Sequence, residues 1–290
     1  MKYFLLIVLF VAVFFIRHYM VHAIFTPKKS IPKKSPSLPF ENIEIKGAKG
    51  TIRGWLMKSE KADGCFILVH GWGSNRSAML RYADSLVVRG YDVLLIDVLG
   101  HGESDYVQKQ VSIETFVTSI QAAMDYVEAQ SAINSHAIYV LGHSMGGLAA
   151  SIVNATDARL KALITDSMPT SLESISQSMT GKVMLPYRPF GWLIVSWFLV
   201  RGGVFFKARG EWHLEKIFNQ QQASAFSIHS SLDQKVPISS VDVLMNNSNF
   251  KEVIKVRTKG HHNCVQDEHF WRHVFRFIDS TKGEKGYETT

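Results

Sequence analysis

The sequence predicts an α/β fold in which helices flank a mostly parallel central sheet. Short apolar runs alternate with longer helix-like segments over most of the 290 residues, and this alternation is typical of parallel strands joined by helical crossovers. Hydrophobic residues make up 46% of the chain, which is enough to form the core of one large domain.

The expected elements follow from these runs in order. Strands are predicted at residues 43–45, 51–57, 65–69, 91–96, 137–141, 162–164, 225–228 and 253–256, the first two as a hairpin. Helices are predicted at residues 78–89, 113–129, 239–247 and 268–278. The pattern breaks between about residues 168 and 222, where the most apolar portion is 191–200. We interpret this interval as an inserted helical cap.

The first 26 residues form a hydrophobic segment. Residues 3–16 are apolar without interruption, and a helix over residues 3–25 would extend about 34 Å, enough to cross a bilayer. We therefore expect an N-terminal membrane-anchor helix and a single-pass membrane protein. The alternative is a secreted protein released by signal cleavage, because Val21-His22-Ala23 fits a cleavage site.

Residues 27–39 are rich in proline, lysine and serine, which predicts an extended linker. The folded domain then covers residues 40–280, and residues 281–290 form a flexible tail. The net charge is +7, but six basic residues precede the first acidic one, Glu41, and the remainder is nearly neutral. This distribution favours a membrane surface over nucleic acid as partner, and the linker lysines favour a cytoplasmic domain.

The two cysteines are expected to be free thiols. Cys65 stands at the start of a predicted strand, whereas Cys264 follows the far end of another. Those two ends lie a strand's length apart in a parallel sheet, which is too far for a disulfide.

A nucleophile elbow is predicted at Gly142-His143-Ser144-Met145-Gly146, which directly follows an apolar strand. A sharp turn from strand to helix strains the corner residue and leaves no room for side chains two positions away, where this motif has glycine. The N-terminus of the following helix would favour negative charge near Ser144.

A serine nucleophile needs a base, and the base needs an acid that holds its tautomer. In the elbow arrangement both follow the serine, at the carboxyl ends of later strands. Asp233 follows the strand at 225–228, and His261 and His262 follow the strand at 253–256. Asp166, at the end of an earlier strand, is an alternative acid.

These motifs resemble the α/β-hydrolase fold of serine hydrolases, close to the serine aminopeptidase and lysophospholipase-like branch, over residues 41–278. The resemblance rests on His70-Gly71-Trp72-Gly73, the segment at residues 97–104, the elbow, Asp233 with Val236-Pro237, and Gly260-His261-His262-Asn263. It implies that Ser144 is the nucleophile and Asp233 the orienting acid. His262 is the implied base because asparagine follows it, with His261 as the alternative. The backbone N–H groups of Trp72 and Met145 form the implied oxyanion hole.

The predicted activity is hydrolysis of a carboxylic ester or thioester of a small-molecule or lipid-like substrate. A serine aminopeptidase and an acyltransferase are alternatives on the same triad, and a binding module without turnover is less favoured. We expect His70 and His101 to shape the backbone. No metal or organic cofactor is expected, although potential ligands crowd the C-terminal region at His261, His262, Cys264, His269 and His273.

Overall fold

The protein is described here by a computed structural model that covers residues 2–27, 30–106, 111–171, 174–175, 177–178, 214–247 and 249–282. An eight-stranded sheet runs through the described part in the order β1-β2-β4-β3-β5-β6-β7-β8. The strands are β1 (Glu41–Gly47), β2 (Gly50–Met57), β3 (Cys65–Val69), β4 (Asp92–Ile96), β5 (Ile138–His143), β6 (Leu160–Asp166), β7 (Ala225–Leu232) and β8 (Phe250–Lys259). The hairpin β1-β2 joins β4 antiparallel, and all later pairs are parallel.

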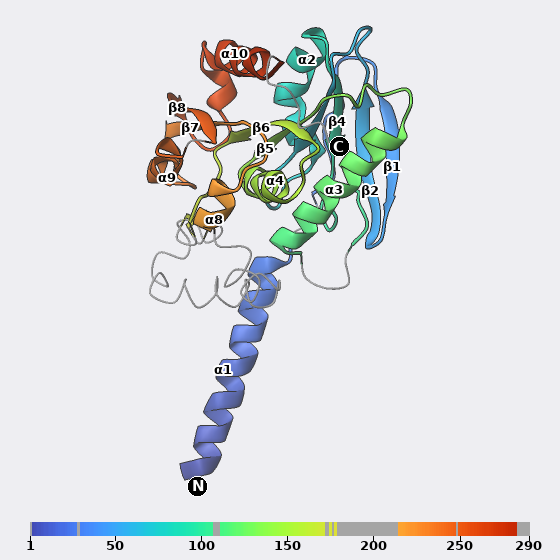
Figure 1. Cartoon of the computed structure of the whole chain (residues 1–290). Coiled ribbons are helices and arrows are strands. Elements are labelled where there is room, and N and C mark those ends of the chain that lie inside the picture. The colour runs from blue at the N-terminus through green and yellow to red at the C-terminus, as the bar shows by residue number, and fades with distance from the viewer. Residues whose placement is uncertain are drawn as a thin grey trace.

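Helices cover both faces of this sheet (Figure 1). On one face lie α3 (Ile113–Ala129), α4 (Met145–Thr156) and α8 (Leu214–Asn219). On the other lie α2 (Leu80–Val88) and α10 (Phe270–Lys282). Strand β3 shows why its sequence is apolar throughout: Cys65, Ile67 and Val69 enter the first core, while Phe66 and Leu68 enter the second. The predicted mostly parallel α/β architecture is therefore confirmed.

Two predicted helices are shorter than expected. The segment before β4 begins as a 3-10 turn, η1 (Arg76–Met79), before it becomes α2. The helix expected at 239–247 is a 3-10 turn, η3 (Ile238–Val241), followed by the single-turn helix α9 (Asp242–Met245). A further 3-10 turn, η4 (Cys264–Gln266), precedes α10. Of the expected cap, residues 172–173, 176 and 179–213 lie outside the described residues, as do residues 283–290 of the expected tail.

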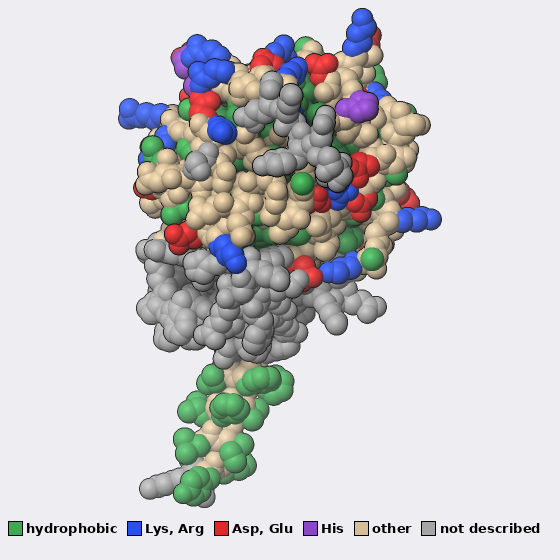
Figure 2. All heavy atoms as spheres, viewed as in Figure 1, with side chains coloured by type: hydrophobic (Ala, Val, Ile, Leu, Met, Phe, Trp, Pro, Cys, Tyr) green, Lys and Arg blue, Asp and Glu red, His purple; other side chains and the backbone are tan. Residues whose placement is uncertain are grey.

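The hydrophobic N-terminal segment is a helix, α1 (Lys2–Phe25), which projects away from the domain (Figure 1). Its large side chains between Tyr3 and Phe15 are exposed, by 44% at Val11 and by 82% at Tyr3, and Figure 2 shows them as a column of hydrophobic atoms. Within the described part of the chain, no helix has the length and hydropathy needed to cross a membrane. The structure thus gives no support to the expected spanning anchor.

Residues 30–40, which precede β1, have no regular secondary structure, but some of them contact the domain. Asn75 donates from Nδ2 to the carbonyl oxygen of Ser30 at 2.9 Å and to its Oγ at 3.0 Å. Ser37 donates to the carboxylate of Asp84 in α2, and Pro36 is buried. Ser30, Pro36 and Ser37 therefore fasten this segment to the domain near η1 and α2, while residues 33–35 between them are exposed.

Both cysteines are free, as expected, and both are buried. Burial raises the pKa of both thiols above the ordinary range, so neither is a ready nucleophile at neutral pH.

Candidate active site

Ser144 occupies the turn between β5, which ends at His143, and α4, which begins at Met145. Its φ of 53° and ψ of −120° lie in a region that residues with side chains rarely adopt. Such backbone strain concentrates at functional sites and is the signature of a nucleophile elbow. The expected strand–turn–helix arrangement around Ser144 is therefore present.

The elbow glycines are required by close backbone approach. A Cβ added at Gly146 would lie 2.5 Å from the carbonyl oxygen of Val69 and 2.6 Å from that of His70. One added at Gly142 would lie 2.5 Å from the carbonyl oxygen of Gly146. The absence of side chains lets the end of β3 and the start of α4 press against the turn that carries Ser144.

Asp233 follows β7 and is aligned by three hydrogen bonds. Its Oδ1 accepts from the backbone N–H groups of Lys235 at 2.7 Å and Val236 at 3.1 Å, and its Oδ2 accepts from His261 Nδ1 at 2.6 Å. Burial raises the pKa of this carboxyl group, but the hydrogen bonds and the charge of His261 outweigh burial and hold the pKa below its usual value. Asp233 is thus an ionised carboxylate that orients an imidazole.

The predicted pairing of Asp233 with His262 is wrong, because His261 makes that hydrogen bond. His262 is exposed, and its ring lies against that of His143 with the centroids 4.7 Å apart. Adjacent residues in a turn project in different directions, so only one of two neighbouring histidines can face a given carboxylate. Here Gly260, with φ of 95°, turns the chain so that His261 faces Asp233.

The alternative acid, Asp166, belongs to a different cluster. Its Oδ2 accepts from the hydroxyl of Tyr82 at 2.5 Å, and its Oδ1 accepts from the hydroxyl of Ser167 at 2.8 Å. Burial, together with the charge of Asp166, raises the pKa of Tyr82 well above its ordinary value, so this phenol remains a donor. The carboxylate of Asp166 is thereby bound to α2 and not to either histidine of the β8 loop.

His70 and His101 shape the loop after β3, as expected. His70 accepts from the N–H of Val98 at 3.1 Å through Nε2 and donates through Nδ1 to the carbonyl oxygen of Gly71 at 2.7 Å. His101 accepts at Nε2 from the N–H of Gly73 at 3.1 Å. Burial lowers the pKa of both residues, that of His101 to about 3. Both rings are therefore neutral and act as fixed hydrogen-bonding groups.

The loop that carries Trp72 passes directly beside Ser144. A Cβ added at Gly71 would lie 3.1 Å from Cβ of Ser144. Trp72 is held by stacking on Phe116, with the ring centroids 6.3 Å apart. Met145 is the first residue of α4, where the backbone N–H groups have no acceptor inside the helix. Trp72 follows Gly71 and Met145 follows Ser144 in the chain, so both residues belong to segments next to the turn that carries Ser144.

Two further histidines, to which the sequence motifs assigned no role, lie close to the site. His229 donates from Nε2 to the carbonyl oxygen of Val236 at 3.0 Å, and the same nitrogen lies 3.6 Å from Asp233 Oδ2. His143, inside the elbow motif, bonds to the backbone of His261. Their positions just after the predicted strands at 225–228 and 137–141 were the only signals in the sequence that could have indicated these contacts.

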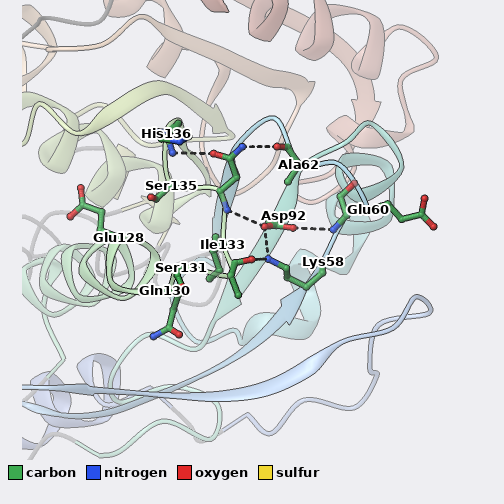
Figure 3. A pocket seen from close by; sticks show the side chains of 13 residues that line it. Lys58, Glu60, Ala62, Asp92, Glu128, Gln130, Ser131, Ile133, Ser135 and His136 are labelled. Carbon is green, nitrogen blue, oxygen red and sulfur yellow. Dashed lines mark hydrogen bonds and ion pairs between the residues drawn. The ribbon is translucent and has the colours of Figure 1, made fainter.

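A hollow of about 580 Å³ (Figure 3) lies at the edge of the sheet where β4 begins. This edge is opposite the one that carries Ser144. Asp92, the first residue of β4, lines the hollow and accepts from Lys58 Nζ at 2.8 Å and from the N–H of Ser59 at 2.9 Å. Asn134 closes the same network by donating to the carbonyl oxygen of Ala62 at 2.6 Å. These polar groups satisfy one another, so we interpret the hollow as a structural feature. Among the described residues, no group of three or more metal-ligating side chains comes together.

The comparisons with known proteins support the fold that carries this site. The family model of the serine aminopeptidases, S33, matches residues 60–182. The esterase Pf2001 of Pyrococcus furiosus superposes with a TM-score of 0.71 over 89% of this chain and 98% of its own, at 21% sequence identity. The chain has the α/β-hydrolase fold.

The chain is also similar to a curated bacterial protein and to a second solved structure. The protein YfhR of Salmonella typhi is 27% identical over 193 residues, which cover 61% of this chain and 65% of that protein. The match thus spans less than two thirds of the curated relative. A membrane phospholipase A, a bacterial virulence factor, superposes with a TM-score of 0.60 over 98% of this chain and 100% of its own, at 20% identity.

Proposed function

We propose that this α/β-hydrolase cleaves a carboxylic ester or thioester through an acyl-serine intermediate, with Ser144 as nucleophile, His261 as base and Asp233 as its partner. The observation that carries the proposal is the 2.6 Å hydrogen bond from His261 Nδ1 to Asp233 Oδ2. It lies at the same edge of the sheet as the strained Ser144. With the proton on Nδ1, the Nε2 lone pair of His261 is available to accept the serine proton.

In the proposed acylation, His261 Nε2 takes the hydroxyl proton of Ser144 while Oγ bonds to the carbonyl carbon of the substrate. The carboxylate of Asp233 stabilises the resulting imidazolium. The backbone N–H groups of Trp72 and Met145 bind the carbonyl oxygen as it becomes negative. His261 then protonates the departing alkoxide or thiolate, and water releases the acyl group by the same steps in reverse order.

The choice of ester or thioester rests on fold similarity and on chemistry. Esters and thioesters have better leaving groups than amides, and the similar fold of the Pyrococcus furiosus protein is that of an esterase. The family model, named for serine aminopeptidases, makes a peptide bond the second candidate. An acyltransferase would use the same residues with an alcohol or amine in place of water.

We further propose that the substrate is lipid-like and that α1 binds the protein to the lipid surface that contains it. Its support is the run of exposed apolar side chains between Tyr3 and Phe15, for which burial in lipid would be favourable. A second support is the similarity, over 98% of this chain, to a membrane phospholipase A.

Fluorophosphonate labelling of the full-length protein tests the central proposal. We expect the wild-type protein to be labelled, Ser144→Ala and His261→Ala to lose labelling, and His262→Ala to retain it. Acyl esters of increasing chain length, compared with aminoacyl anilides, then separate an esterase from an aminopeptidase. Absence of labelling in folded wild-type protein would overturn the proposal, and loss confined to Ser144→Ala and His262→Ala would reassign the base.

A further inference from the structure

The proposed nucleophile and base come from strands that are not neighbours. Ser144 follows β5 and His261 follows β8, with β6 and β7 between them in the sheet. Neighbouring strands lie about 4.8 Å apart, so these two lie about 14 Å apart. The loop after β8 must therefore fold back across the sheet edge, and some contact has to fix how far it reaches.

His143 makes such a contact. Its Nε2 lies 2.9 Å from the backbone carbonyl oxygen of His261. A carbonyl oxygen only accepts, so Nε2 carries the proton and donates it. The His143 ring also packs against the rings of His261 and His262, with both centroid distances 4.7 Å. One side chain of the elbow thus binds both the backbone and the rings of the histidine loop.

His143 also lies against the loop that carries Gly71. A Cβ added at Gly71 would lie 3.3 Å from His143 Nδ1. The residue is only 2% exposed, so it is enclosed between the elbow, the Gly71 loop and the histidine loop. Burial lowers the pKa of His143 well below 6.5, and the charges of Arg81 and the two neighbouring histidines lower it further. The ring is therefore neutral and keeps a single N–H group.

We infer that His143 is a positioning residue: its Nε2–H, by binding the carbonyl oxygen of His261, fixes the histidine loop relative to Ser144. His143 touches no reacting atom and acts through the backbone of His261. Asp233 fixes the orientation of the His261 ring, whereas His143 fixes the position of its backbone. This inference rests on the proposed function.

The test compares His143→Gln with His143→Asn in the full-length protein. Both substitutes are polar amides and differ by one methylene. The amide nitrogen of glutamine can take the place of Nε2, whereas that of asparagine falls short of the His261 carbonyl oxygen. We expect His143→Asn to lower the fluorophosphonate labelling rate and the kcat for a p-nitrophenyl ester by about fivefold to tenfold. KM should be unchanged, and His143→Gln should stay within about threefold of wild type.

Equal rates for both variants, whether both are normal or both reduced, would overturn the inference, because the role would then not depend on the N–H group. Fluorophosphonate labelling of wild type and of Ser144→Ala is the control. If only wild type is labelled, the proposed function holds, and equal rates for the His143 variants would then overturn this inference alone. Should either variant not fold, the ring tautomer of His143 in the wild-type protein decides by 1H–15N NMR. A proton on Nε2 supports the inference, and a proton on Nδ1 overturns it.

Discussion

The backbone N–H of Ser144 donates to the backbone carbonyl oxygen of Asp166 at 2.8 Å, so the turn that carries the serine continues the pairing of β5 with β6. This places a buried carboxylate one strand away from the elbow, in addition to Asp233. Both acids stand at or just after the carboxyl end of a strand. They differ in their partners, which are Tyr82 and Ser167 for Asp166 but His261 for Asp233.

The two carboxylates are therefore expected to respond differently to substitution. Asp233→Asn should retain the fold and lower kcat by about 10³-fold or more, because the neutral amide no longer holds the catalytic tautomer or stabilises the imidazolium. The measurement is ester hydrolysis together with thermal unfolding.

The matched change at the other cluster is Tyr82→Phe, which removes a hydroxyl that donates to Asp166. We expect it to lower the free energy of unfolding by about 1–3 kcal/mol, while each folded molecule labels at the wild-type rate. An Asp233→Asn protein with normal turnover, or a Tyr82→Phe protein that is stable but inactive, would show that the two acids have been assigned the wrong way round.

The elbow glycine and a loop glycine provide a second comparison. At Gly146 an added Cβ meets backbone carbonyl oxygens at 2.5 and 2.6 Å, and backbone cannot move aside as a side chain can. At Gly73 the φ of 68° is unfavourable for alanine, but nothing lies within 4 Å of the added Cβ. Gly73→Ala should therefore cost about 1–2 kcal/mol. Gly146→Ala should cost several times more and remove labelling, as urea unfolding and fluorophosphonate labelling would measure. Equal costs would contradict the close approach of β3 to the elbow.

The sequence was sufficient to predict the features that depend on local pattern. The run at 65–69 is apolar on both faces because both faces are buried, and the glycines around Ser144 reflect a steric constraint that any such turn imposes. The segment at 238–245 was less predictable, because its helix ends after one turn at Met245, just before the pair Asn246-Asn247.

The pairing of His261 with Asp233 depends on how the loop after β8 crosses the edge of the sheet, and no local sequence pattern predicts that path. His261 and His262 are adjacent and chemically identical, so the choice between them is made by the turn at Gly260 and by the bond from His143. The contact between His143 and His261 joins residues 118 positions apart. This contact can be predicted only after β5 and β8 have been placed in the same sheet.

Helix α1 supports a prediction about lipid binding. The full-length protein should sediment with phosphatidylcholine–phosphatidylglycerol vesicles, also at 1 M salt, because apolar burial is insensitive to screening by salt whereas attraction of the linker lysines is not. A chain of residues 27–290, which keeps the contacts of Ser30 and Ser37 with the domain, should remain in the supernatant.

The matched control for α1 is the full-length double variant Leu6→Arg with Leu9→Arg. These side chains are 60% and 61% exposed, so their replacement should leave the domain intact while it weakens sedimentation. Full-length protein that stays in the supernatant would rule out the proposed lipid contact. Sedimentation that salt reverses would assign binding to the lysines.

The free energy of unfolding should decrease at acidic pH because of the buried histidines. His70, His101 and His143 have folded-state pKa values below the 6.5 of a free histidine, because burial disfavours the charged ring in each case. Below about pH 6.5 the unfolded chain therefore binds protons that the folded protein excludes, and the free energy of unfolding decreases as pH drops. For His101, whose pKa is about 3 in the folded protein and 6.5 in the unfolded chain, the decrease continues from about pH 6.5 down to about pH 3. Each such group contributes about 1.4 kcal/mol per pH unit.

Urea unfolding at pH 7.5, 6 and 5, on wild type and His101→Gln, isolates this contribution. Glutamine offers an amide oxygen to the N–H of Gly73 in place of Nε2 and does not titrate. The variant should therefore lose less stability between pH 6 and pH 5 than wild type, by about 1 kcal/mol. Identical slopes for the two proteins would mean that His101 takes up a proton in the folded state. In that case the bond from the N–H of Gly73 could not persist, because a protonated imidazole has no acceptor.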